Sequence, residues 1–183
     1  MRKTHGSYAN PVVDRLPDFS YNGGKVENIM NIKTKKKNKN ISKMELMYMT
    51  QFLAENILGK RLAANVSLTI HFKKLKKNHW AYCEAYMLDG RKYRDFTIEV
   101  NKKLKRKKLI KTIAHELVHV KQYARNEFDH KSGIDYKWKG SIISIEDKDY
   151  VKMPWEVEAR SYEEPMYEKY INHLRENPPK FLG

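Results

Sequence analysis

The stretch AHELVHV, residues 114–120, decides how the rest of the chain is interpreted. It places His115 and His119 four residues apart, with Glu116 directly after the first histidine. Residues i and i+4 of an α-helix lie one turn apart on the same face, so both imidazoles can reach one metal ion. Glu116 lies about 100° further round the helix, so it reaches beside such an ion rather than binding it. The spacing therefore predicts a metal site with a base next to it.

The residues around this stretch predict a helix over residues 105–125, with apolar side chains at helical spacing. These apolar residues are Ile110, Ile113, Ala114, Leu117 and Val118. Two histidines and a glutamate on so apolar a helix would carry a large desolvation cost without a purpose. The alternative is a chance pattern in which both histidines are hydrogen-bonded within the core.

A catalytic zinc site normally has three protein ligands and one open position, so a third ligand is required. The extended motif HExxHxxGxxH is excluded, because Gln122 occupies its glycine position and Arg125 its last histidine position. His130 is a candidate on an expected loop, and Glu156 and Glu158 are candidates at the start of an expected helix. Helical residues two apart point about 200° from each other, so only one of these glutamates can face the metal. Periodicity alone does not choose between them.

HELVH followed downstream by WEVEA resembles the gluzincin type of zinc metallopeptidase, whose third ligand is a glutamate on a later helix. In that group the pattern Glu-x-x-Ala-Asp/Asn recurs, and its first glutamate binds zinc. The chain matches the pattern at Glu156 and Ala159 but has Arg160 at the last position, where the group's residue often supports a zinc-binding histidine. The resemblance implies a zinc peptidase acting on peptides or proteins. The ligands and general base that it implies are His115, His119, Glu156 and Glu116.

The longer string HELVHVKQYARNEF, with PWEVEAR downstream, is similar to small SprT-like metallopeptidases, many of them phage-encoded. SprT-like proteins use a third histidine, so the chain departs from them there. The resemblance covers residues 66–170 and implies that a strand beside the active-site helix borders the cleft and binds substrate as an added strand. Residues 95–101, DFTIEVN, are expected to be that edge strand. The oxyanion donor stays open among Tyr123, Tyr162 and His130.

The expected fold is α+β: a minimal zincin-like domain with a small antiparallel sheet packed on the active-site helix, plus a downstream ligand helix. Residues 66–72, 79–88 and 95–100 alternate with period two, which predicts a meander of about three strands. Asp89-Gly90 is a hairpin signal. The aromatic face of the second strand either stacks nucleobases or packs under a helix. That face carries Trp80, Tyr82 and Tyr86.

The helices have start and stop signals of their own. Ser42 and Glu45 form a predicted capping box for a helix that ends near Gly59. Residues 126–149 are expected to be irregular. A later helix begins at Pro154, breaks or kinks at Pro165, and is followed by a last helix that ends near Glu176.

The chain divides into two parts by composition. Residues 1–40 are expected to be a basic, poorly ordered N-terminal segment, and residues 41–183 the zincin-like metallopeptidase domain. The run TKKKNKN, residues 34–40, is either a solvated linker or an arm for nucleic acid. The lone Cys83 cannot form an internal disulfide, and no apolar stretch is long enough to cross a bilayer. A cytoplasmic location fits best, within a host cell if the protein is phage-encoded.

The net charge of +15, which comes mostly from lysine, attracts polyanions such as nucleic acid. A lysine-rich chain can also arise from an AT-rich genome with no binding role. Beside the peptidase interpretation we therefore keep a basic nucleic-acid-associated protein, either a DNA-linked SprT-like protease or a non-catalytic zinc-binding module. A basic protein whose HExxH motif is coincidental or inactive is the third interpretation.

Overall fold

The computed structural model describes residues 30–76, 79–88, 92–146 and 149–180, and its fold is α+β. Its larger sheet has four strands in the order β1-β2-β4-β3. The strands are β1 (Asn31–Lys35), β2 (Ser67–Lys73), β3 (Ala81–Leu88) and β4 (Lys92–Asn101). β1, β2 and β4 run parallel, and β3 is antiparallel to β4. Alternate side chains of β2 and β4 are buried, which puts one face of the sheet against the core.

The predicted antiparallel meander is confirmed for β3 and β4, which pair antiparallel, but it is wrong for β2. β2 lies beside β4 rather than beside β3, and residues 95–101 therefore belong to an interior strand. The open edge next to the later helices belongs to β3. Alternation identifies a strand but not its neighbour, and β4 takes the interior position with a fully buried Ile98 at its centre. β3, whose Tyr82 and Tyr86 are exposed, lies at the edge.

The N-terminal segment is only partly covered by the described residues. Residues 1–29, for which poor order was predicted, lie outside them. Residues 31–35 form β1, which pairs with β2, so the prediction of an irregular segment up to residue 40 is wrong there. The strand was missed because only Ile32 of its five side chains is buried, which leaves a weak alternation signal.

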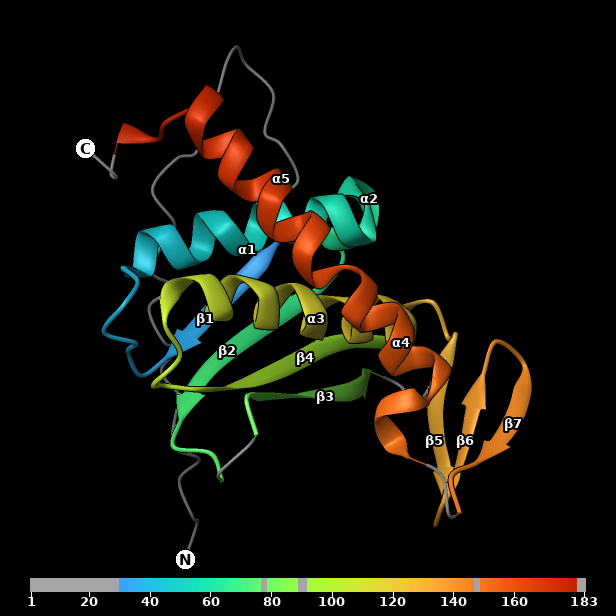
Figure 1. The fold of residues 1–183 in the computed structure, drawn as a ribbon. Helices are drawn as coiled ribbons and strands as arrows, with labels where there is room; N and C mark the ends of the chain where they lie inside the picture. The colour runs from blue at the N-terminus through green and yellow to red at the C-terminus, as the bar shows by residue number, and fades with distance from the viewer. Residues whose placement is uncertain (1–29, 77–78, 89–91, 147–148, 181–183) are drawn as a thin grey trace, which may run out of the picture.

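Figure 1 shows α1, α3 and α5 on the same side of the larger sheet, with α3 running roughly along β3 and β4. The helices are α1 (Lys43–Leu58), α2 (Lys60–Ala63), α3 (Arg106–Ala124), α4 (Pro154–Ser161) and α5 (Glu163–Glu176). The Ser42 side chain accepts a hydrogen bond from the Glu45 amide, as predicted, but the Glu45 carboxylate binds Arg106 instead of closing the capping box. The predicted helix ends at Gly59 and Glu176 are confirmed. The break between the last two helices falls at Tyr162, and Pro165 lies in the first turn of α5.

Residues 126–149, which were expected to be irregular, contain a second sheet. It has three antiparallel strands in sequence order, β5 (Phe128–Ser132), β6 (Asp135–Trp138) and β7 (Ser141–Ser144). A short 3-10 helix, η1 (Tyr150–Lys152), leads from this sheet into α4. These strands are short and half-exposed, so they carry little alternation. The second sheet lies beside α4, at the end of the molecule that Figure 1 shows in orange.

Two groups of buried side chains hold these layers together. The large core lies between the four-stranded sheet and the three long helices, and includes Ile98, Leu117 and Tyr170. A smaller aromatic cluster surrounds Trp155 and joins the second sheet to α4. Among the described helices, none is both long and apolar enough to cross a membrane.

Candidate metal centre

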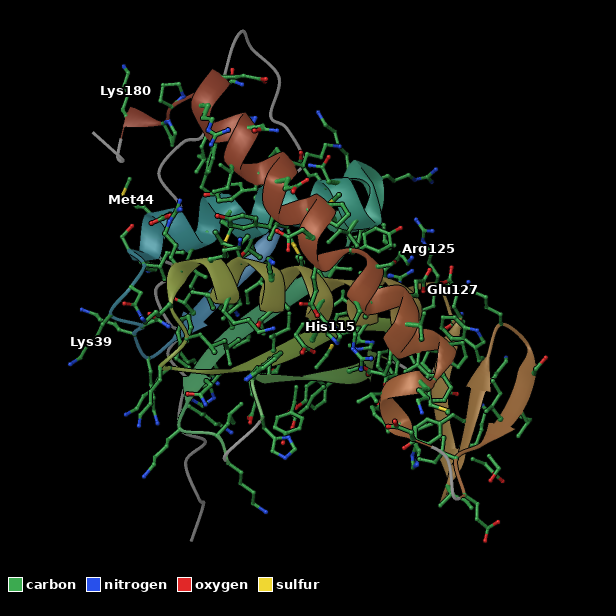
Figure 2. The ribbon with its side chains drawn as sticks, viewed as in Figure 1. Lys39, Met44, His115, Arg125, Glu127 and Lys180 are labelled. Atoms are coloured by element: carbon green, nitrogen blue, oxygen red, sulfur yellow. The ribbon has the colours of Figure 1, made fainter. Side chains whose placement is uncertain are left out.

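The helix α3 carries both histidines of the HExxH motif on the side that faces α4. Figure 2 shows His115 on α3, close to the point where α4 gives way to α5. The imidazole Nε2 atoms of His115 and His119 are 3.2 Å apart. Glu156, in the first turn of α4, places its two carboxylate oxygens 3.5 Å from Nε2 of His115 and 3.2 Å from Nε2 of His119. The structure thus gathers these three side chains into one candidate metal-binding triad.

The distances within this triad fit a tetrahedral ion. Zinc binds histidine nitrogen and carboxylate oxygen at about 2.0–2.2 Å, so two such ligand atoms lie ~3.4 Å apart across a tetrahedral centre. The two Nε2 atoms are 3.2 Å apart, Oε1 of Glu156 lies 3.2 Å from Nε2 of His119, and Oε2 of Glu156 lies 3.5 Å from Nε2 of His115. Two imidazole nitrogens and one carboxylate are also the donor set of many catalytic zinc sites. The residues present therefore fit the metal that the motif implies.

A second layer of side chains orients the two imidazoles. Nδ1 of His115 lies 3.1 Å from Oε1 of Glu163, the first residue of α5. Nδ1 of His119 lies 2.9 Å from Oε1 of Gln122. Because both partners are oxygen acceptors, each Nδ1 donates a hydrogen bond to one of them, and each Nε2 is turned toward the centre of the triad. This orientation suits metal binding, in which each Nε2 gives up any hydrogen it carries and binds through its lone pair.

The two candidate glutamates of α4 have separate tasks. Glu156 is buried and faces the histidines, whereas Glu158 accepts hydrogen bonds from Nε2 of Gln122 at 2.7 Å and from Nζ of Lys121 at 2.9 Å. The third candidate, His130, lies on β5 with Nε2 3.1 Å from the Gly133 carbonyl. The structure therefore brings Glu156, and neither Glu158 nor His130, to the two histidines.

Sequence reasoning missed Gln122 and Glu163 as parts of the site. Gln122 entered only as a departure from the extended motif, yet it is fully buried and also donates to the Trp155 carbonyl at 3.0 Å. Its position three residues after His119 was the available signal, because i and i+3 share a helix face. Glu163 accepts the hydrogen bond from a zinc-ligand histidine that the gluzincin pattern assigns to the position of Arg160. Arg160 instead lies 3.4 Å from Glu156 and donates to the Val151 carbonyl. Nothing in the spacing identified Glu163, because the break between α4 and α5 determines where it points.

The charges of the triad are tightly linked. Burial acts to lower the pKa of His115, but its contacts with Glu156 and Glu163 outweigh burial and raise that pKa to about 9. Burial acts to raise the pKa of Glu156, and the two histidines overcome it and hold that pKa well below the usual value. The surroundings therefore favour positive charge at the centre of the triad.

The glutamate of the motif that is not a ligand lies beside the triad. Glu116 is buried, and burial raises its pKa, although His119 and His115 partly oppose the shift. A base is most effective when its pKa lies near the working pH, so a raised carboxyl pKa suits proton transfer. Glu116 lines the same cleft as the triad, which has a volume of about 370 Å³.

The cleft runs between the edge strand β3 and the α3–α4 pair. Its walls include Trp80, Tyr82 and Cys83 on the β3 side and Tyr150 and Arg160 on the opposite side. Of the three oxyanion-donor candidates from the sequence, Tyr123 lines the cleft. Tyr162 instead packs against Lys121, and His130 belongs to the second sheet. Tyr150 was not predicted; burial raises its pKa to about 12, so its hydroxyl stays protonated at neutral pH.

Comparison of the chain with models of known families, with curated proteins and with solved structures finds no match. A helix with two histidines and a buried glutamate, completed by a carboxylate from a second helix, defines the candidate centre.

Proposed function

We propose that the protein is a zinc-dependent metallopeptidase of the zincin-like, gluzincin type. The observation that carries the proposal is the triad of His115, His119 and Glu156, whose separations match those around a tetrahedral zinc ion. A metal site with three protein ligands leaves one coordination position open, which is typical of catalytic rather than structural zinc. The cleft beside the triad gives a peptide access to that position.

The residues divide the chemistry between them. When bound, zinc lowers the pKa of a coordinated water toward ~7 and polarises the scissile carbonyl group. Glu116 takes the proton of the attacking water and later delivers it to the leaving amine. Glu163 and Gln122 hold the imidazoles in the required tautomer. Tyr150 and Tyr123 are the two cleft hydroxyls from which a donor to the oxyanion would come.

The edge strand β3 gives the cleft a means of binding extended peptides. Asn101 donates its amide to the Trp80 carbonyl at 2.9 Å, and residues opposite each other in an antiparallel pair alternate between bonded and non-bonded. This alternation turns the amide and carbonyl groups of Ala81, Cys83 and Ala85 away from β4, toward the open edge. A substrate added there as a strand is recognised mainly through its backbone, with modest sequence preference.

The direct test is hydrolysis of quenched fluorescent peptides by the zinc-loaded protein. Glu116→Gln is expected to keep stoichiometric zinc and to lose about 10²–10⁴-fold in kcat. Glu84→Gln is the matched control, because Glu84 is an exposed carboxylate on the outer face of β3, and its activity should be unchanged. Full activity in Glu116→Gln would refute the assignment of the base. Stoichiometric zinc without any hydrolysis by the unsubstituted protein would favour the non-catalytic zinc module.

Substrate binding along β3 has its own test. Proline at Cys83 removes an amide that faces the open edge beside the cleft, and proline is tolerated at such edge positions. Cys83→Pro is expected to raise KM at least several-fold while zinc is retained. Ala85→Pro removes the next outward amide, beyond the residues that line the cleft, and should have a smaller effect. Equal KM values for both variants and the unsubstituted protein would exclude this mode of binding.

A further inference from the structure

The N-terminal end of α3 carries a concentration of lysine that the metal centre does not use. The chain brings two lysine-rich segments together there, residues 35–39 at the end of β1 and just after it, and residues 102–105 between β4 and α3. We call the exposed lysines of these segments the lysine surface. They are Lys35, Lys36, Lys37, Lys39, Lys102, Lys103 and Lys105.

The two segments are fixed to each other by asparagine side chains. Asn38 and Asn40 both donate their side-chain amides to the Leu104 carbonyl, at 3.2 and 2.9 Å. Asn38 is buried, and its Oδ1 accepts the Asn40 amide at 2.7 Å, which closes a tight turn in the first segment. Lys36 enters this turn with a positive φ of 62°, a conformation that costs a non-glycine residue free energy. The lysine surface is therefore a built part of the fold.

The lysine surface has little negative charge to neutralise it. Among the described residues, none of its seven lysines has a carboxylate oxygen within 4 Å, whereas the neighbouring Arg106, Lys107 and Lys108 do. The α3 N-terminus adds positive potential, because it has no acidic residue in its first turn and no side-chain cap. His71 on the adjacent β2 responds to this field: burial, then Lys73, Lys36 and Lys35, lowers its pKa.

Basic residues at a helix N-terminus oppose the helix dipole, so this arrangement destabilises the isolated fold. An anion at the surface would reverse that effect, since backbone amides and lysines would then face a negative group. Lysine is a point charge that suits phosphate and does not read base edges. Membrane-binding surfaces also present apolar side chains for insertion, whereas the exposed side chains of these two segments are all lysines.

We propose that the lysine surface binds the phosphate backbone of nucleic acid without sequence preference. The surface lies at the N-terminal end of α3, whereas His115 lies near the middle of that helix: Lys105 and His115 are ten residues apart, or ~15 Å along the helix. Figure 2 shows Lys39 pointing outward from this end of the molecule, away from His115. The cleft is therefore left open to a peptide while nucleic acid is bound. The inference does not depend on the proposed peptidase activity.

The test is fluorescence anisotropy with a 20-base-pair duplex of arbitrary sequence, a scrambled duplex and a single strand of the same length, over a range of salt concentrations. The logarithm of the binding constant should fall linearly with the logarithm of the salt concentration, with a slope of about −0.9 for each phosphate contacted on the duplex. Lys36→Glu/Lys37→Glu/Lys39→Glu and Lys102→Glu/Lys103→Glu/Lys105→Glu should each bind at least tenfold more weakly, with a slope reduced by about 2–3.

The matched control is Lys60→Glu/Lys169→Glu/Lys180→Glu, which changes the net charge equally at exposed lysines outside the surface. It should bind within about threefold of the unsubstituted protein. Asn38→Ala, which separates the two segments without changing the charge, should weaken binding, provided that circular dichroism shows a folded protein. Glu116→Gln should bind normally, which separates this inference from the peptidase proposal.

Three results would overturn the inference. Equally weakened binding in the control variant with three substitutions would show that binding depends on the net charge and not on the lysine surface. An affinity that is independent of salt would exclude phosphate contacts. Binding to vesicles containing anionic lipid, with none to either duplex, would assign the surface to membranes.

Discussion

The two packing units of the molecule support the same metal centre from opposite sides. The large core fixes α3, and with it His115 and His119, through fully buried residues such as Leu117. The small aromatic cluster fixes α4, and with it Glu156, through Trp155, which lies at the start of that helix. Gln122 spans the boundary, because it touches His119 on one side and the Trp155 carbonyl on the other.

The three ligands therefore do not share one source of rigidity. The histidines lie on a helix covered on several sides, whereas the glutamate depends on a half-exposed three-stranded sheet and a handful of aromatic contacts. Elements with fewer buried apolar contacts open at lower free energy than the main core. Loss of the metal centre should therefore begin on the side of Glu156.

The largest expected effect comes from removing the centre of the aromatic cluster. Trp155 is fully buried, with its ring centroid 4.9 Å from that of Phe128 and 5.2 Å from that of Tyr136. Trp155→Ala should cost about 3–5 kcal/mol in this unit and weaken zinc binding by loosening α4. Hydrogen exchange should show faster amides in β5 and α4 while β2 and β4 stay protected. Uniform acceleration across both sheets would contradict the separation into two units.

The corresponding change in the large core is Ile98→Ala. Ile98 is fully buried at the centre of the interior strand β4, so the substitution should cost about 2–5 kcal/mol. Here the loss should appear in the global unfolding free energy measured with urea, and protection should fall in both sheets. A variant that loses zinc but keeps its urea midpoint would reverse the roles that we assign to the two units.

The boundary between the units can be tested at Gln122. Gln122→Leu keeps the buried volume but removes the support of His119 and the bond to Trp155, so zinc affinity should fall about 10–100-fold. Chelator competition measures this change. Glu163→Gln is the companion variant on α5 and should have a smaller effect, because an amide oxygen can still accept the His115 hydrogen bond. An unchanged affinity in Gln122→Leu would show that packing alone orients His119.

The smallest expected effect concerns the polar link between the two sheets. Tyr93 on β4 donates a hydrogen bond to Asp129 on β5 at 2.8 Å, worth about 0.5–1.5 kcal/mol. Burial acts to raise the pKa of Asp129, but Lys131 and Tyr93 outweigh it and lower that pKa. Because the pKa of Asp129 is lowered in the folded state, its carboxylate stabilises the fold above pH ~4, the pKa of an aspartate in the unfolded chain. This stabilisation is lost as the pH falls through the pKa of the folded state. In Asp129→Asn the free energy of unfolding should therefore depend less steeply on pH at acidic pH, as measured by urea unfolding between pH 2 and 6.

The features that the sequence predicted best are those that depend on short-range interactions along the chain. The HExxH spacing determines that His115 and His119 share a helix face, and the observed α3 agrees with the predicted helix to within one residue at each end. Ser42 and Gly59 likewise mark the start and end of α1 through local backbone chemistry. Such features need only short-range interactions, which is why they could be read from the chain.

Features that depend on distant partners could not be predicted in the same way. Alternation in residues 66–72 and 95–100 identified two strands but not that they lie side by side and parallel. The choice of Glu156 over Glu158 needed the tertiary contacts of Gln122 and Lys121, which hold Glu158 away from the triad. The periodicity left that choice open, and the resemblance to gluzincins favoured the residue that the structure places at the triad.

The most direct test of the central claim is the metal content of Glu156→Gln beside Glu158→Gln. Both changes remove one carboxylate charge from α4, and only the first removes an oxygen that faces the two histidines. After zinc loading and dialysis, elemental analysis should find one zinc per chain in the unsubstituted protein and in Glu158→Gln, and none in Glu156→Gln. Zinc retained in Glu156→Gln and lost from Glu158→Gln, or absent from the unsubstituted protein, would contradict the account.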